Sequence, residues 1–104
     1  MRITIAHKKS KHEVVDSIDR GFDDAFRMEG LPVKLELQQK NWQGSTMTFA
    51  LNARVGFMSS PIKGTIDVSD RDVTIDADLG MFERFVSEEK VRGALSTRFK
   101  GLLN

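Results

Sequence analysis

Two histidines are the first residues in this chain whose side chains could do chemistry. His7 shares the alternation of Ile3 and Ile5, which would place its ring at the rim of an apolar core. It could act as an acid or base only beside a carboxylate or a substrate, so a hydrogen-bonded histidine at the end of a strand is the simpler interpretation. His12 falls in the first turn of a predicted helix, where we expect it in solvent. Two histidines five residues apart, in a chain without cysteine, are a weak basis for a zinc site.

Three aspartates form the next candidate group. Asp67, Asp76 and Asp78 alternate onto a common face of a predicted β-hairpin. Paired carboxylates carry out acid–base chemistry when burial separates their pKa values, and nothing in the sequence buries this face. The chain also lacks a glycine-rich phosphate loop, a nucleophile elbow and a metal-binding motif. The sequence therefore assigns no catalytic residue, no metal ligand and no cofactor, and it predicts a protein that is not an enzyme.

A third group is apolar and lies in a stretch that fits neither strand nor helix periodicity. Val55, Phe57 and Met58 belong to the segment 55–61, which we expect to connect two strands that pair with Phe49 opposite Ile66 and Ala53 opposite Ile62. Large apolar residues are unusual in a surface connection. Two interpretations stay open: an exposed patch that contacts a partner, a twin subunit or a hydrophobic polymer, or a loop that closes one end of the core. The same two interpretations apply to a second apolar cluster, formed by Met81, Phe82, Phe85 and Val86.

The element that must position these groups is a hairpin between residues 60 and 80. Alternation on both sides of Ser69–Asp72 predicts two strands joined by a four-residue loop. Its register is strongly specified, because a slip by one residue would turn the apolar face into water. Gly64 opposite Ala77 leaves a dent, which we expect an aromatic side chain from a helix to fill. Alternatively, the dent is the floor of a ligand cavity that has His7 at its mouth. The register pairs Val68 with Val73, Ile66 with Ile75, Gly64 with Ala77, Ile62 with Leu79, and Lys63 with Asp78.

Length and composition restrict the class of protein. The 104 residues predict one domain over 1–104, and the formal net charge of +1 gives no reason to expect a nucleic-acid partner. The absence of cysteine is typical of a reducing compartment, and no apolar run is long enough to cross a membrane. The N-terminus has no apolar stretch of the kind found in secretory signals, so we expect a cytoplasmic protein.

Periodicity along the chain predicts two amphipathic helices and five strands. Ser10 with Glu13 has the spacing of a capping box, and Ser87 before two glutamates indicates a second helix start. Every predicted strand has one apolar and one polar face. We therefore expect an α+β fold, a five-stranded antiparallel sheet with both helices on one face, in the order β-α-β-β-β-β-α. The predicted elements are strands over 2–7, 33–39 and 45–54, a loop over 40–44 that carries Trp42, the hairpin strands, and helices that follow Ser10 and Ser87.

The order and spacing of these features resemble a small bacterial family, the polyhydroxyalkanoic acid system proteins. The shared features are the opening strand into His7, the helix after Ser10, Trp42 and Gly44 before a strand with Phe49, the run from Gly64 to Val68, the turn at Asp70, Val73 to Ile75, and Leu79-Gly80 before a closing helix. The segment 55–61 departs from the family pattern because it is more apolar. The resemblance implies a link to polyhydroxyalkanoate storage granules, and it supplies no catalytic residues to carry over.

Three functional hypotheses follow. The first is a non-enzymatic accessory protein that binds the granule surface or a granule protein through the two apolar clusters. The second is a small-ligand-binding domain or enzyme with a cavity between sheet and helices, lined by His7, Gly64 and Ala77. The third is a homodimer built on a strand edge or on the closing helix.

Overall fold

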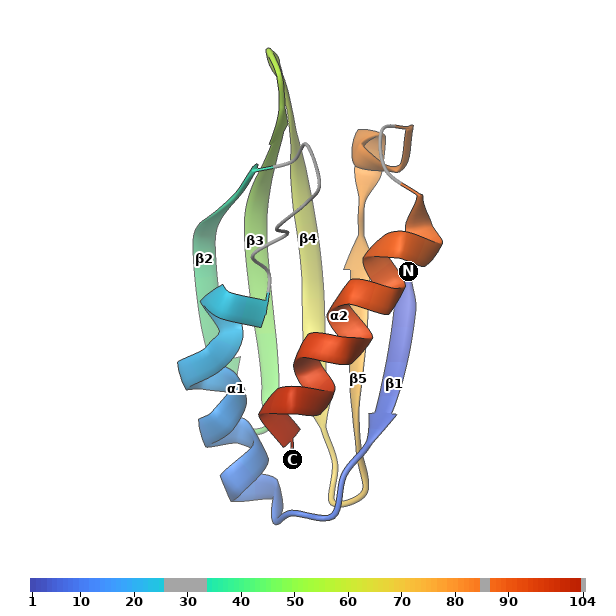
Figure 1. The fold of residues 1–104 in the computed structure, drawn as a ribbon. Coiled ribbons are helices and arrows are strands. Elements are labelled where there is room, and N and C mark those ends of the chain that lie inside the picture. Colours follow the sequence, from blue (N-terminus) through green and yellow to red (C-terminus); the bar gives the residue numbers. More distant parts are fainter. Residues whose placement is uncertain (26–33, 85–86, 104) are drawn as a thin grey trace.

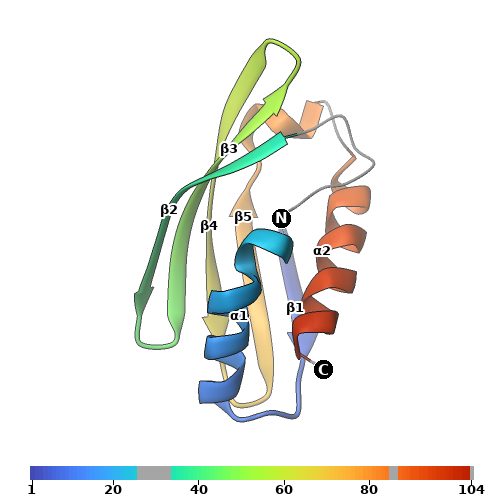
Figure 2. The same ribbon diagram turned by 60° about the vertical axis from the view of Figure 1, so that its left-hand side comes forward.

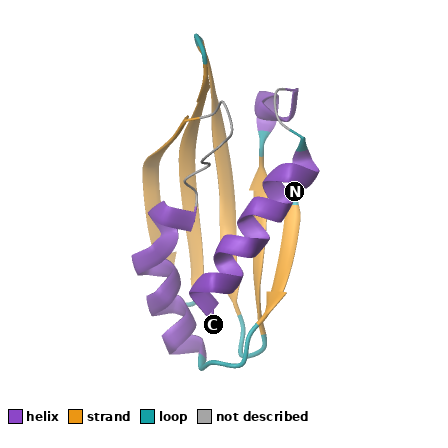
Figure 3. Cartoon of the chain, viewed as in Figure 1, coloured by secondary structure: helices purple, strands orange, loops and turns teal. Residues whose placement is uncertain are grey.

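The computed structural model describes residues 1–25, 34–84 and 87–103, and its elements follow the predicted order (Figure 1). One strand and one helix are followed by four consecutive strands and a closing helix, as the periodicity indicates, with one short 3₁₀ helix added before the last element (Figure 3). The elements are β1 (Arg2–Ala6), α1 (Lys11–Ala25), β2 (Lys34–Gln43), β3 (Thr46–Val55), β4 (Met58–Val68), β5 (Asp72–Asp78), η1 (Gly80–Arg84) and α2 (Glu88–Leu103).

The five strands form one antiparallel sheet in the order β1-β5-β4-β3-β2. Both helices cover the same face of this sheet, and the opposite face is open (Figures 1 and 2). The predicted α+β architecture is therefore confirmed. It arises because each strand has a single apolar face, and the apolar stripes of two amphipathic helices can be buried only against that face.

The register of the β4–β5 hairpin agrees with the sequence pattern. Ile66 pairs with Ile75, and the polar pair Lys63 and Asp78 lies on the open face. Val68 and Val73 flank the predicted four-residue loop. The alternation predicts this register because any odd shift would expose a row of buried side chains.

The register of β3 with β4 differs from the prediction by two residues. We expected Phe49 opposite Ile66, but Phe49 lies opposite Gly64, because 55–61 is not a long connection. Val55 pairs with Met58 across a two-residue turn, so β4 begins four residues earlier than the predicted hairpin strand. A shift of two preserves which face each side chain occupies, so the predicted inward residues of β3 are still buried: Met47, Phe49, Leu51 and Ala53.

Strand β2 also runs further than predicted. The segment 40–44 is not a loop, because β2 continues to Gln43 and turns at Gly44 and Ser45. A β-bulge between Leu37 and Gln39 makes this extension possible, since the extra residue changes which positions face the helices. Beyond the bulge Trp42, opposite the buried Met47, is partly buried against the core. Figure 2 shows the resulting curve of β2 around α1.

The core lies between the sheet and the two helices. Helix α1 contributes Val14, Ile18 and Phe22, and the ring of Phe22 lies 5.2 Å from that of Phe49 in β3. The two helices approach closely where Gly21 meets Leu102. Both predicted starts are present: the Glu13 backbone N–H donates to Ser10 Oγ over 3.2 Å, and the Val91 N–H donates to the Ser87 carbonyl. Helix α2 buries the residues of its predicted stripe, Val91, Leu95, Phe99 and Leu103.

Candidate functional site

The β3–β4 hairpin carries the most exposed large apolar side chain of the described residues. Its turn, Gly56-Phe57, lies at one end of the long axis of the molecule, beyond the helices (Figure 1). Phe57 has a relative exposure of 108%, and Met58 next to it has 45%. Val55 is half-buried and packs against the core, so it fixes the base of the turn. The interpretation that this segment closes the core is therefore wrong for Phe57 and Met58.

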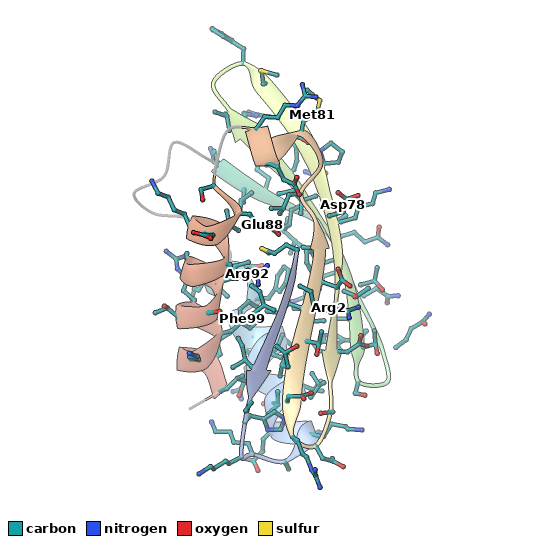
Figure 4. The ribbon with its side chains drawn as sticks, turned by 90° about the vertical axis from the view of Figure 1, so that its right-hand side faces the viewer. Arg2, Asp78, Met81, Glu88, Arg92 and Phe99 are labelled. Carbon is teal, nitrogen blue, oxygen red and sulfur yellow. The ribbon has the colours of Figure 1, made fainter. Side chains whose placement is uncertain are left out.

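The 3₁₀ helix η1 places a further apolar side chain at the same end. The Gly80 backbone N–H donates to Asp78 Oδ1 over 3.0 Å, which turns the chain away from β5. Gly80 then lies against Ser60 and Pro61 of β4. Met81, the next residue, is 49% exposed (Figure 4). We call Val55, Phe57, Met58 and Met81 the apolar tip.

Two residues of the predicted patch cannot be assigned to the apolar tip. The side chain of Phe82 and the whole of Phe85 lie outside the described part of the chain, as does Val86. Their predicted role stays a prediction. The apolar tip holds no titratable group, so its chemistry is that of a surface that removes apolar area from water when it is covered.

His7 is a buried structural residue. Its side chain is only 7% exposed, and its Nε2 hydrogen-bonds the Ser69 carbonyl at 2.8 Å. The His7 backbone N–H also donates to the Arg71 carbonyl at 2.9 Å. These two bonds join the β1–α1 connection to the β4–β5 turn. Within the described residues, Nδ1 is buried without a hydrogen-bond partner.

The structure does not bring His7 together with Gly64 and Ala77. Met1 is hydrogen-bonded to Ala77 through both its backbone groups, whereas His7 lies just past the other end of β1, a separation of about 20 Å. The dent at Gly64 is filled by Phe49, whose Cζ would stand 2.5 Å from an added Cβ. The aromatic residue comes from β3 and not, as expected, from a helix; the helical Phe22 supports it from behind.

The three aspartates lie at separate positions on the open face, and each is bonded to a different residue. Asp67 accepts a hydrogen bond from the Thr46 hydroxyl at 2.6 Å, and Asp76 pairs with Arg2 at 3.1 Å. Asp78 accepts from the Gly80 N–H. Within the described ranges, no group of three His, Cys, Asp or Glu side chains is arranged to hold a metal ion.

One cluster was missed by the sequence reasoning. Trp42 Nε1 donates to Asp19 Oδ1 at 2.9 Å, and Lys40 Nζ lies 3.2 Å from the same oxygen. The Trp42 hydrogen bond, followed by the Lys40 hydrogen bond, lowers the pKa of Asp19 from its ordinary value of 3.8. These contacts fasten α1 to the edge strand β2. The sequence pattern did not indicate this cluster because the bulge at Gln38 changes which face the later residues of β2 occupy. In a regular strand, Lys40 and Trp42 would lie on the opposite face of the sheet.

The geometry thus provides one exposed apolar surface and no assembled reaction centre among the described residues. None of the helices in the described part of the chain is long and apolar enough to cross a membrane. Comparison with protein-family models, with curated proteins and with solved structures finds no match to this chain.

Proposed function

We propose that this protein is a non-enzymatic binding module that attaches to a hydrophobic surface through the apolar tip. The observation that supports it is the full exposure of Phe57 on a tight turn. A phenylalanine at that position contributes nothing to the core, and a group of exposed large apolar side chains at one end of a molecule is typical of an interaction surface. The two-residue turn restrains the backbone, so little ordering is required on contact.

The size of the apolar tip limits it to weak, reversible attachment. Fully burying a Phe or Met side chain stabilises a contact by about 1.5–3 kcal/mol. Phe57 is fully exposed and Met58 and Met81 are about half exposed, so covering all three would supply on the order of 3–5 kcal/mol before the entropy of association is subtracted. This value favours a surface offering many equivalent positions over a single small ligand.

The proposed surface is that of a polyhydroxyalkanoate granule, or a protein on it, in the bacterial cytoplasm. This part of the proposal rests on the resemblance of the sequence to the polyhydroxyalkanoic acid system proteins. The polymer is a polyester whose surface is apolar, which agrees with the chemistry of the tip.

Co-sedimentation with purified granules tests the proposal. The variant Phe57→Ser/Met58→Ser removes the two exposed apolar side chains of the β3–β4 hairpin and should fold normally, because neither is buried in the core. We expect its recovery with granules to fall at least tenfold. Leu37→Ser is a matched control, because Leu37 is 41% exposed in β2, away from the tip. Equal recovery of wild type and the double variant, both correctly folded by circular dichroism, would refute the proposal.

A further inference from the structure

The end of the molecule opposite the apolar tip carries a group of basic side chains. The β1–α1 connection contains Lys8 and Lys9, and Lys11 begins α1. The β4–β5 turn adds Arg71, which is exposed. In Figure 1 this connection and this turn lie beside each other, at the end of the sheet away from the β3–β4 turn. We call Lys8, Lys9, Lys11 and Arg71 the basic end.

The basic end is held in place by the buried His7. The hydrogen bonds of His7 to Ser69 and Arg71, at 2.8 and 2.9 Å, connect the two loops. The Ser69 hydroxyl accepts from the Arg71 and Asp72 N–H groups and so closes the turn itself. Three neighbouring lysines and the distant Arg71 are therefore presented together on a restrained backbone.

These cations do not serve the stability of the fold. Within the described residues, none of the four makes an ion pair. Positive charge beside the N-terminal end of a helix is unfavourable, and Lys8, Lys9 and Lys11 flank the start of α1. A surface that costs stability is more readily explained by a partner.

Three carboxylates lie close to the basic end, and two of them accept hydrogen bonds from hydroxyl groups. Glu13 is bonded to the Ser10 hydroxyl at 3.0 Å, and Asp72 to the Ser69 hydroxyl at 2.8 Å. Asp70, in the turn, is exposed and has no bonded partner in the described residues. A hydrogen bond from a neutral hydroxyl leaves a carboxylate charged, so Glu13, Asp70 and Asp72 all oppose binding of an anion and reduce the formal charge of this end to +1. Asp70 is the carboxylate that can be replaced without removing a hydrogen bond within the described residues.

We propose that the basic end docks on an anionic phospholipid surface. Three of its four cations are lysines, which act as point charges toward a diffuse field and lack the bidentate geometry of arginine. The two loops contain no Phe, Trp or Tyr on which a nucleic-acid base could stack. Each basic residue at an anionic membrane contributes about fivefold in affinity and the three carboxylates oppose it, so we expect a dissociation constant no lower than about 1 mM.

Vesicle sedimentation tests this docking independently of granule binding. The probes are phosphatidylcholine vesicles and vesicles of phosphatidylcholine and phosphatidylglycerol in equal parts, at about millimolar lipid. We expect binding only to the anionic vesicles and its loss in about 1 M NaCl, where the Debye length is about 3 Å. Lys8→Gln/Lys9→Gln/Lys11→Gln should lower affinity about 100-fold, and Asp70→Asn should raise it about fivefold.

The matched control is Lys34→Gln/Lys63→Gln/Lys90→Gln, which removes three exposed lysines elsewhere. Both triple variants change the formal net charge from +1 to −2, so only position distinguishes them. Retained vesicle binding by the control alone supports the proposal. Equal loss in both triple variants, binding to neutral vesicles, or tighter binding of a single-stranded oligonucleotide than of anionic vesicles would each overturn it.

Discussion

Phe49 fills the space that the absence of a side chain at Gly64 leaves on the inner face of the sheet. A Cβ at position 64 would stand 2.5 Å from Phe49 Cζ and 2.6 Å from the Asp76 carbonyl oxygen. The second contact involves backbone of the neighbouring strand, which cannot move without disturbing the ladder. We expect Gly64→Ala to lower the free energy of unfolding by about 1–3 kcal/mol, measured by urea denaturation.

Gly93 provides the matched comparison for that substitution. It lies in α2, and a Cβ there would meet nothing within 4 Å. Because alanine favours the helix over glycine, Gly93→Ala should raise the free energy of unfolding by about 0.5–1 kcal/mol. If both alanine variants had the same stability, Phe49 would not be packed against position 64 as described.

The Asp19–Trp42 contact predicts a pH-dependent effect. The folded pKa of Asp19 lies below its ordinary value of 3.8, so its stabilising contribution is complete above 3.8 and is lost as pH falls through the folded pKa. Trp42→Phe removes the N–H donor and should lower stability by about 1 kcal/mol or less at neutral pH, because the Asp19 side chain is 48% exposed. Thermal denaturation followed by circular dichroism should show this difference shrinking below pH 3.8.

The control for the pH effect is the same substitution in an Asp19→Asn background. Asparagine retains an acceptor for the indole but has no charge to titrate, so the stability cost of Trp42→Phe should then be independent of pH. A cost that stays constant in the presence of Asp19 would contradict the assignment of the pKa shift to this hydrogen bond.

At the scale of elements, the two tight hairpins are defined by glycine at the first turn position. Gly44 and Gly56 have φ of 61° and 60°, and each is followed by a residue with negative φ, the arrangement of a type II′ turn. Both glycines are visible in the sequence. The Gly56 turn was missed because Phe57 and Met58 obscure the polar signature expected of a loop.

Alanine at these turn glycines should therefore cost stability through the backbone alone. A Cβ at Gly56 or Gly44 meets nothing within 4 Å, so packing is unaffected. We expect Gly56→Ala and Gly44→Ala each to lower the free energy of unfolding by about 1–2 kcal/mol, the cost of an L-residue in the left-handed region. Phe57→Ala, at the exposed next position, should change stability by less than about 0.5 kcal/mol.

Local sequence patterns predicted which elements form better than they predicted where each element begins and ends. The stripe of α2 and the β4–β5 register follow from periodicity, because burial of one face leaves no alternative. The β3–β4 register was wrong by two because alternation is insensitive to even shifts. The bulge at Gln38 cannot be recognised from alternation, so the inward position of Lys40 was not predicted.

At the scale of the whole molecule, the order of the strands in the sheet determines which segments of the chain are neighbours. The N-terminal strand pairs with β5 at the far edge from β2, an arrangement that depends on long-range contacts and not on local pattern. All four residues of the apolar tip belong to the two apolar clusters that the sequence predicted. The basic end was not predicted, because its members belong to two segments that come together through the pairing of β1 with β5 and through the buried His7.

The same topology separates the two proposed binding surfaces by the length of a strand. The turns on either side of β4 lie at its opposite ends, and its eleven residues span about 36 Å in a molecule 42 Å long. This distance exceeds the Debye length of about 8 Å at physiological salt, so charge at the basic end cannot influence the apolar tip.

The homodimer stays a prediction, which light scattering after size exclusion would decide.

The two ends should therefore act independently. Phe57→Ser/Met58→Ser should lose granule recovery and keep its affinity for anionic vesicles, whereas Lys8→Gln/Lys9→Gln/Lys11→Gln should do the reverse. The combined variant should show both losses with unchanged magnitude, because sites this far apart without shared partners have additive effects. Added salt should release the protein from vesicles and leave granule binding intact, since burial of apolar area is not screened. If either variant impaired both forms of binding while its circular dichroism stayed native, the two ends would not be separate surfaces.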